Sequence, residues 1–307
     1  MSNYFKVIKP GINSTFQDLG RFGLQHLGIV ASGCMDQLLF CISNKLVGNK
    51  VSEGALEFAY QGPLLELVGE SALVAISGKV NFNVLKKNGE IKQGTTNESF
   101  TIYNGDKIDI LSTVNSVYGY LSILGGFKLK EIKGSVSTLV RAKIGPNNGD
   151  KLKLEDKIFF NKTNSSYKTK KIHLNFDQDN SIRVMKGSQI GYFSKKSQED
   201  FFSKEYKVTR LTDRMGMRLE GEKLENKVNK NIKSEGITKG SIQVPGDGQP
   251  IILLSDHPTI GGYPKIANVI TADYDKLVQK IPGTNIKFKL VDLAVAESAF
   301  QEYIKKF

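Results

Sequence analysis

Residues 248–270 read GQPIILLSDHPTIGGYPKIANVI. The apolar run at 251–254 predicts a buried β-strand, and IANVI at 266–270 predicts a second one. The polar, glycine-containing loop between them is longer than the about two to six residues that a simple connection needs. The pattern therefore favours a β-rich fold with a candidate functional loop between two strands.

Most of the remaining chain also reads as short strands bounded by glycine or by Asn/Asp turns. Asn104-Gly105 lies between two such runs and predicts a β-hairpin. Helical patterns are fewer, and one of them begins at a capping Asp36 and ends at Gly48. Strands are predicted at 63–69, 72–78, 100–111, 116–126 and 242–255, and helices at 36–48, 273–279 and 294–304. The fold class is mainly β with a few helices, which favours barrels or sandwiches over alternating βαβ units.

Two domains are expected from the length of 307 residues and from the polar segment NKTNSSYKTKK. That segment, at 161–171, is interpreted as a linker between a domain at 1–160 and a domain at 172–307. Three pairs of similar segments recur in the same order, which favours an internal duplication. They pair 21–28 with 214–221, 61–67 with 248–254, and 104–111 with 282–291.

The composition excludes several classes of protein. The net charge is +12, but the lysines are scattered and no nucleic-acid-binding motif is present, so no nucleic-acid partner is expected. No apolar run approaches the roughly 18–20 residues that span a bilayer, and no secretory signal is recognisable, so a cytoplasmic protein without membrane association is expected. Cys34 and Cys41, with three scattered histidines, have no zinc-site spacing and are interpreted as buried apolar residues; no metal site is predicted.

Two clusters combine an acid and an arginine with glycines: STFQDLGRFG at 14–23 and TDRMGMRLEG at 212–221. Arginine presents a fork of donors that suits a carboxylate or a carboxyphosphate-like anion. Two interpretations are equally favoured for Asp18 with Arg21 and for Asp213 with Arg214. Each pair could bind a ligand, or it could be an ion pair that only fixes a turn. A third cluster, ASGCMD at 31–36, contributes Asp36 as a secondary candidate.

The loop after 251–254 holds the densest set of candidates. Asp256 follows the strand directly, Gly261 and Gly262 could present backbone donors to an oxyanion, and Lys265 could hold a carboxylate or carbamate. A purely structural loop, with Asp256 as a turn former, is the alternative. His257 is interpreted as space-filling, with a proton shuttle as the alternative.

With these clusters the sequence resembles the allophanate hydrolase subunit 2 family, the KipA-like, biotin-dependent-carboxyltransferase-like proteins that include the C subunit of 5-oxoprolinase. The resemblance is specific because its motifs run in order through nearly the whole chain. They are STFQDLGRFGLQHLGI, SGCMD, NKLVGN, ALEFAYQGPLLEL, LGG, GSVSTLVRAKIG, TDRMGMRLEG, SIQVPGDGQPIILLSDHPTIGGYPKIANVITAD and QKIPGTNIKF. The chain departs from the family pattern at Val136, at His257-Pro258 and at 146–154.

The resemblance implies two tandem cyclophilin-like β-barrels, and it implies a KipI-like and a LamB-like subunit as partners. It implies ATP-dependent conversion of 5-oxo-L-proline to L-glutamate by the complex, with this chain expected to be inactive alone. ATP is expected to act through the complex, and no biotin is expected on this chain, because the residues flanking Lys186 do not match a biotin acceptor. The chain also contains no standard phosphate-binding loop.

The alternatives are a carboxyltransferase component that acts on urea or another small amide with a separate biotin carrier, and a regulatory protein that binds a KipI-like kinase inhibitor. For the enzymatic interpretations, Arg214 and Lys265 are predicted to bind an anion and Asp256 to handle a proton or orient the substrate. The substrate, a small amide or lactam, is predicted to contact Gln243, Thr259, Gly261, Gly262 and Tyr263.

Overall fold

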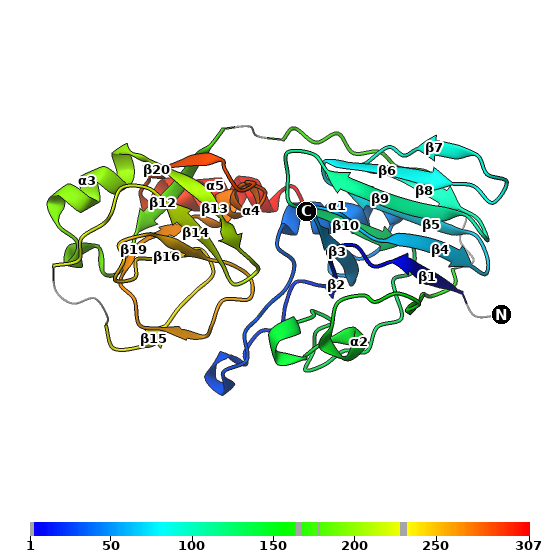
Figure 1. Cartoon of the computed structure of the whole chain (residues 1–307), viewed down its shortest axis with the longest axis horizontal. Helices are drawn as coiled ribbons and strands as arrows, with labels where there is room; N and C mark the ends of the chain where they lie inside the picture. The colour runs from blue at the N-terminus through cyan, green and yellow to red at the C-terminus, as the bar shows by residue number, and fades with distance from the viewer. Residues whose placement is uncertain (1–2, 164–167, 177–178, 228–231) are drawn as a thin grey trace. The chain divides into compact units, whose positions relative to one another are not determined.

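The computed structural model describes residues 3–163, 168–176, 179–227 and 232–307. The chain forms two compact units, one of residues 1–21, 32–175 and 307 and the other of residues 22–31 and 176–306 (Figure 1). Residues 22–31 belong to the second unit, although they precede most of the first unit in sequence. A single linker, as predicted from the sequence, therefore does not separate the two units completely. Of the linker predicted at 161–171, residues 164–167 lie outside the described residues, and Lys170 pairs with Ser99 at the edge of a sheet.

The N-terminal unit is built from two antiparallel sheets. The six-stranded sheet has the order β11-β1-β4-β9-β6-β7, and the five-stranded sheet has the order β2-β3-β10-β5-β8. The strands are β1 (Tyr4–Lys9), β2 (Asn13–Gln17), β3 (Ala55–Ala59), β4 (Leu64–Val68), β5 (Ala72–Ser77), β6 (Val80–Leu85), β7 (Ile91–Gln93), β8 (Glu98–Ile102), β9 (Lys107–Thr113), β10 (Tyr118–Ile123) and β11 (Lys157–Phe159). Strands predicted at 63–69, 72–78 and 116–126 are therefore confirmed as β4, β5 and β10.

Residues 72–76 of strand β5 are all apolar because both faces of the strand are covered. Alternate side chains point to opposite faces of a strand. Val74 and Ile76 join the core between the sheets, whereas Leu73 and Ala75 join a cluster with residues of helix α1 (Gln37–Val47). The predicted helix at 36–48 is confirmed, with the Asp36 side chain accepting from Leu39 N at 2.8 Å and Gly48 as its C-cap.

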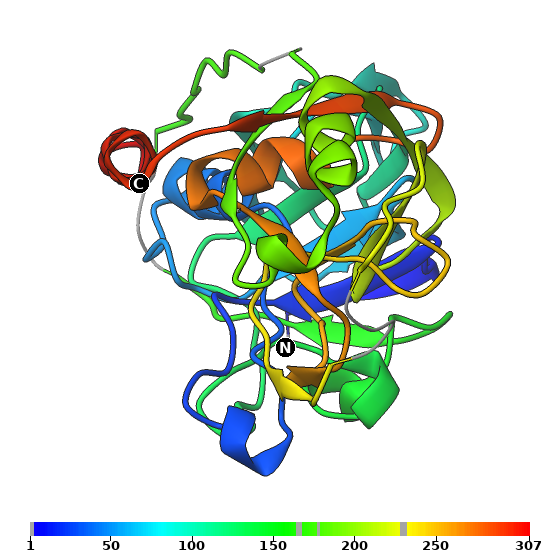
Figure 2. The ribbon, with the colours of Figure 1, turned by 90° about the vertical axis from the view of Figure 1, so that its left-hand side faces the viewer.

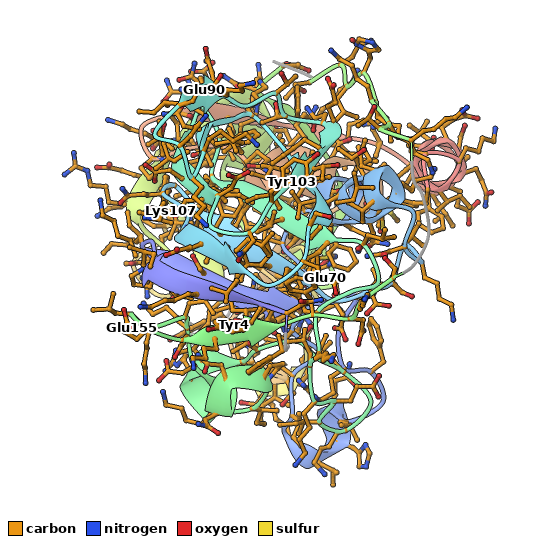
Figure 3. All side chains as sticks on the ribbon, turned by 90° about the vertical axis from the view of Figure 1, so that its right-hand side faces the viewer. Tyr4, Glu70, Glu90, Tyr103, Lys107 and Glu155 are labelled. Atoms are coloured by element: carbon orange, nitrogen blue, oxygen red, sulfur yellow. The ribbon has the colours of Figure 1, made fainter. Side chains whose placement is uncertain are left out.

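The outward side of the six-stranded sheet carries polar and charged side chains. Lys6 pairs with Glu155 at 2.8 Å, and the ammonium group of Lys157 lies 5.3 Å from the centre of the Tyr4 ring. Figure 3 shows Tyr4, Lys107 and Glu155 over the ribbons of this sheet. This alternation of buried and solvated residues fixes the register of the strands, since a slip by one residue would invert both faces.

The C-terminal unit contains a closed barrel with the order β12-β19-β16-β17-β14-β13-β20. Its strands are β12 (Ser181–Lys186), β13 (Glu205–Thr212), β14 (Gly216–Glu220), β16 (Ser241–Gln243), β17 (Ile251–Leu253), β19 (Lys265–Val269) and β20 (Asn285–Leu290). A separate ribbon pairs β15 (Glu235–Gly236) with β18 (Ile260–Gly261). The barrel interior holds fully buried side chains such as Ile242, Ile252 and Ile266.

Three helices accompany the barrel: α3 (Lys195–Ser203), α4 (Thr271–Val278) and α5 (Leu293–Ile304). Phe201 of α3 stacks on Phe288 of β20 with ring centroids 4.6 Å apart. Asp273 of α4 accepts hydrogen bonds from the Arg183 side chain, and Tyr303 of α5 donates to Asp275 at 2.7 Å. The helices predicted at 273–279 and 294–304 are thus confirmed as α4 and α5. The short elements are η1 (Gln25–Leu27), η2 (Val140–Ala142), η3 (Ile190–Tyr192) and the turn α2 (Pro146–Gly149).

The mainly β fold with a few helices is confirmed, and a barrel is present. The cyclophilin-like character of two tandem barrels stays a prediction. The strands of the N-terminal unit form two separate sheets, while those of the C-terminal unit close into a barrel.

The predicted hairpin at Asn104-Gly105 is wrong. β8 pairs with β5 in one sheet, whereas β9 pairs with β4 and β6 in the other. The turn therefore carries the chain from one sheet to the next, and Asn104 Oδ1 accepts from Gly69 N at 3.1 Å. Gly105 has a φ of 83°, so the dipeptide supplies the expected backbone geometry but not the expected strand pairing.

The three pairs of repeated segments correspond only in part: the second and third pairs contain strands in both units, β4 with β17 and β9 with β20, whereas the first pair differs. Residues 21–28 contain the 3-10 helix η1, whereas 214–221 contain strand β14. β4 pairs with β9 in the first unit, but β17 pairs only with β14 and β16 among the described strands. The strand pairing thus differs between the two units, and the internal duplication stays a prediction.

The turn at 103–106 depends on Asp106. Its carboxylate accepts from Lys86 Nζ at 2.8 Å, Lys87 N at 3.0 Å and Tyr103 N at 3.2 Å. Burial alone would raise the pKa of Asp106, but these hydrogen bonds outweigh it and hold the pKa below its ordinary value.

We expect Asp106→Asn to lower the free energy of unfolding at neutral pH by about 1–3 kcal/mol, because it replaces charge-assisted hydrogen bonds to a buried acceptor. A depressed folded-state pKa stabilises above the ordinary Asp pKa of about 3.9, and this stabilisation is lost as the pH falls through the folded value. Urea denaturation at several pH values measures both effects. Glu90→Gln, which removes an exposed pair with Lys92, is the control and should change little; equal losses in the two variants would contradict the role of Asp106.

Candidate functional site

Arg214 and Asp256 form a buried, bidentate ion pair in the C-terminal unit. Arg214 precedes β14 and Asp256 follows β17, and these two strands are paired through Gly216 and Leu253. Arg214 Nε donates to Asp256 Oδ2 at 2.9 Å, and Nη2 donates to Oδ1 at 3.0 Å. The side chains are only 8% and 9% exposed. The guanidinium fork is therefore already engaged by a carboxylate of the same chain.

Asp213 does not take part in this pair. Its carboxylate is exposed and accepts from Met215 N at 2.8 Å and Gly216 N at 3.2 Å. The predicted ion pair between Asp213 and Arg214 is therefore wrong, because the acid that pairs with Arg214 is Asp256. Asp213 shapes the turn, whereas Arg214 ties it to the end of β17.

A second cluster surrounds Lys265 at the start of β19. Lys265 pairs with Gln243 across the β16–β19 ladder, and both residues are buried. The Lys265 ammonium forms an ion pair with Glu235, whose Oε1 also accepts from Gln189 Nε2 at 2.8 Å. In turn, Gln189 Oε1 accepts from the backbone N of Lys265 at 3.2 Å.

Gly261 lies close to the side chain of Gln243. A Cβ at Gly261 would lie 2.6 Å from Gln243 Nε2, so a larger residue would require the end of the Gln243 side chain to shift. The same amide lies 3.4 Å from the carbonyl oxygen of Tyr263, to which it donates. Gly262 accepts from Ile232 N at 2.8 Å through its carbonyl oxygen, and Thr259 accepts from Ile237 N at 3.2 Å. These bonds tie the loop to Ile232 and Ile237 and, through Tyr263, to Gln243 of β16.

The strand register separates the two clusters. Gln243 pairs with Ile251 at the start of β17, and Asp256 lies beyond Leu253 at the other end of this strand. Strand residues rise about 3.3 Å each, so Arg214 and Asp256 lie at one end of the β16–β17 ladder and Lys265 at the other. The structure therefore brings Lys265, Gln243, Gly261 and Tyr263 together but does not join them to Arg214 and Asp256.

His257 is buried beside Asp256. Burial lowers its pKa, although a contact with the Pro258 carbonyl oxygen opposes this effect. The Nδ1 atom lies 2.6 Å from that oxygen. Because a carbonyl oxygen can only accept, Nδ1 carries the proton in the neutral ring and Nε2 is an acceptor. A neutral imidazole of this kind is chemically able to accept a proton.

The secondary candidates lie in the N-terminal unit and hold loops in place. Asp18 accepts from Ser135 Oγ at 2.8 Å and Val136 N at 2.8 Å, while Arg21 donates to the carbonyl oxygens of Ile132, Ser135 and Ser137. The two residues brace the same segment rather than forming the hydrogen-bonded ion pair that the sequence suggested. Burial lowers the pKa of Arg21, and the Asp18 charge opposes the shift.

Asp36 caps α1, and its backbone N donates to Tyr120 Oη at 2.8 Å. Tyr120 donates to the buried Glu57 carboxylate at 2.7 Å, and this carboxylate also accepts from Met35 N. Burial, followed by the charge of Glu57, raises the pKa of Tyr120 well above its ordinary value. Asp36 is thus placed as a structural residue of the N-terminal unit.

Residues 27–290 match the model of the carboxyltransferase domain, subdomain A and B. The chain belongs to this carboxyltransferase family. It is 35% identical to the 5-oxoprolinase C subunit of Haemophilus influenzae over 284 residues, which cover 92% of this chain and 90% of that protein. The resemblance read from the sequence motifs is therefore confirmed.

Solved structures of the family share the fold over nearly the whole chain. The crystal structure of the Kluyveromyces lactis urea carboxylase matches with a TM-score of 0.88 and 29% identity, over 99% of this chain and 29% of that one. The crystal structure of TTHA0988 matches with a TM-score of 0.83 and 29% identity, over 93% of this chain and 55% of that one. The chain thus spans about half of one of these proteins and less than a third of the other.

Glu235 and Gln189 were not among the residues predicted from the sequence. They come from β15 and from the residue before η3, and no periodic or glycine-rich pattern marks either position. Only the folded barrel brings Glu235 and Gln189 into contact with Lys265. Among the described residues, no group of three or more His, Cys, Asp or Glu side chains could hold a metal ion, and no helix is long and apolar enough to cross a membrane.

The Arg214–Asp256 pair is expected to show strong coupling. Arg214→Leu or Asp256→Leu should each lower the free energy of unfolding by about 3–5 kcal/mol, because either one leaves a buried charge without its partner. The double variant should lose much less than the sum. Urea denaturation followed by circular dichroism measures the cycle, with the exposed Arg218→Leu on β14 as a control that should cost little. Additive losses would contradict the coupling.

Proposed function

We propose that this chain is the C subunit of an ATP-dependent 5-oxoprolinase that converts 5-oxo-L-proline to L-glutamate. The observation that carries the proposal is the match to the 5-oxoprolinase C subunit of Haemophilus influenzae, which covers 90% of that protein. A match over nearly the full length of both chains supports the same role as a separate subunit. We further propose a KipI-like subunit and a LamB-like subunit as its partners in a cytoplasmic complex.

Lys265 and Gln243 are the proposed contacts of this chain to the substrate. The buried ammonium of Lys265 suits the carboxylate of 5-oxoproline, and the Gln243 amide can donate to or accept from a lactam. Thr259, Gly261, Gly262 and Tyr263 form the loop that covers them. Opening a lactam is slow because its amide is stabilised by resonance, so groups that hold the developing anion would lower the barrier.

Arg214 and Asp256 are proposed to support this loop from the other end of β17. Asp256 N donates to Arg214 O at 2.8 Å, in addition to the two side-chain bonds. Neutral His257, the next residue, is the candidate in this chain for accepting a proton. No phosphate-binding loop occurs in the sequence, so we assign ATP to the complex and no residue of this chain to its phosphates.

A carboxyltransferase component acting on urea with a separate biotin carrier is the second candidate. It is favoured by the TM-score of 0.88 to the Kluyveromyces lactis urea carboxylase over 99% of this chain. In that case Lys265 would bind the carboxylate or carbamate group that is being transferred, and not the carboxylate of 5-oxoproline. Urea itself carries no carboxylate, which makes the two candidates distinguishable by substrate.

The test is to purify the chain with a KipI-like and a LamB-like protein of the same organism and to measure glutamate release from 5-oxoproline with and without ATP. We expect ATP-dependent release by the complete complex and none by this chain alone. Lys265→Met and Gln243→Leu should each lower kcat/KM by about tenfold or more, since one charged or polar contact to substrate contributes about 1.4 kcal/mol or more. Lys287→Met, on β20, is the matched control.

Two results would contradict the proposal. A complete complex that releases no glutamate but accepts a carboxyl group from carboxybiotin onto urea would favour the second candidate. A chain that binds the KipI-like protein tightly while the complex hydrolyses neither substrate would favour the regulatory alternative. Full activity of Lys265→Met would overturn the site assignment while leaving the family membership unchanged.

A further inference from the structure

Among the described residues of the C-terminal unit, the two buried cations Arg214 and Lys265 have very different partners. Arg214 is bound bidentately by Asp256, which is 9% exposed. Lys265, whose side chain is 8% exposed, is paired with Glu235, which is 44% exposed. A buried ammonium group needs an anionic partner, whereas a half-exposed carboxylate is solvated readily on release. Only the second pair can therefore exchange its carboxylate at little cost.

Glu235 is also weakly anchored by the backbone. It lies in β15, a strand of two residues that pairs with the equally short β18 through Glu235–Gly261 and Gly236–Ile260. Such a small ladder makes few backbone hydrogen bonds, so it opens more easily than the barrel strands. By contrast, Lys265 is part of the barrel and is held by its ladder with β16.

One of the two donors to the Glu235 carboxylate, the Gln189 amide, is oriented by contacts that do not involve Glu235. Gln189 Oε1 accepts from Lys265 N at 3.2 Å and from Ser188 Oγ at 2.9 Å, which directs its Nε2 atom toward Glu235 Oε1. Lys265 Nζ and Gln189 Nε2 thus donate to the same carboxylate oxygen, and both the Lys265 backbone and the Gln189 amide are held by contacts that do not involve Glu235. Hydrogen bonding from Lys265 and then from Gln189 lowers the pKa of Glu235, so this side chain is ionised at neutral pH.

We propose that Glu235 is a displaceable internal carboxylate that occupies, on Lys265 and Gln189, the position taken by the carboxylate of a bound ligand. On binding, the ligand carboxylate replaces Glu235, and the Glu235 side chain turns to solvent. The ion pair of the buried Lys265 is kept in both states. The Gln243 amide, on the paired position of β16, then lies beside the bound ligand.

This inference rests on the proposed function for its ligand, the carboxylate of 5-oxoproline, but the exchange itself requires no reaction. The probes are therefore acetate, which has only the carboxylate, and 2-pyrrolidinone, which is the lactam ring without the carboxylate. With 5-oxo-L-proline they separate recognition of the two groups.

The experiment measures binding of the three probes to the full chain by NMR titration. Glu235→Gln removes the competing charge, so we expect acetate and 5-oxoproline to bind about fivefold tighter or more, with 2-pyrrolidinone unchanged. Lys265→Met should abolish the binding of acetate. Glu205→Gln alters an exposed glutamate of the same unit, which contacts Asn285, and should leave all three affinities unchanged.

A second measurement uses the unaltered chain and so does not depend on the folding of a variant. The pKa of the Glu235 carboxyl, followed by carbon-detected NMR, should rise toward its ordinary value when acetate saturates the chain, because Lys265 then pairs with acetate. A Glu235 pKa that does not respond to acetate would overturn the inference. So would a Glu235→Gln variant that binds the carboxylates no more tightly, or that gains equally for 2-pyrrolidinone.

The outcome is separable from that of the proposed function. A complex that makes no glutamate, with acetate still raising the pKa of Glu235, leaves the inference standing and contradicts the oxoprolinase. A complex that makes glutamate, with no effect of Glu235→Gln on carboxylate binding, contradicts the inference alone.

Discussion

The parallel pairing of β12 with β20 closes the barrel of the C-terminal unit, and the candidate site depends on that closure. Ser181–Val184 lie beside Lys287–Leu290, which joins the beginning of the unit to its end. β12 is then free on its other side to pair with β19, and β19 pairs with β16. This order sets Lys265 opposite Gln243 and brings Gln189, which follows β12, to the backbone of Lys265. Figure 2 shows the C-terminal unit facing the viewer, with β20 as the orange-red ribbon that crosses the upper part of the view.

The second constraint is that three cationic side chains of the C-terminal unit are each paired with an acid of the same unit. Arg183 with Asp273, Arg214 with Asp256, and Lys265 with Glu235 all satisfy it, but at different degrees of exposure. The first two acids are almost inaccessible, so their ion pairs stabilise a single arrangement of strand ends and helix α4. Glu235 is the only acid of the three with substantial contact to water. The net positive charge of the chain does not affect these three ion pairs, since the remaining lysines are mostly solvated.

Local signals in the sequence were sufficient where one segment determines its own structure. Asp36 and Gly48 delimit α1 because a cap and a left-handed glycine act within one helical turn. Asn104-Gly105 shows the limit of such signals: the dipeptide specifies a turn, but which strands pair afterwards depends on the packing of two sheets. The partner of Arg214 was similarly out of reach, because Asp213 is its neighbour in sequence while Asp256 is its neighbour across the β14–β17 ladder. Glu235 carries no local pattern at all, and only the fold connects it to Lys265.

Val136 and Pro258, two of the departures from the family pattern, contact neighbouring residues through backbone atoms. At Val136 the backbone N donates to Asp18 Oδ2, and at Pro258 the backbone carbonyl oxygen lies against His257 Nδ1. Neither interaction uses the side chain that distinguishes this chain, so other residues could make the same contacts. Pro258 is exposed, and it precedes the loop segment that covers Gln243. A proline at this position fixes φ and removes a backbone donor, and the hydrogen bonds that join Lys265, Glu235 and Gln189 involve no atom of Pro258.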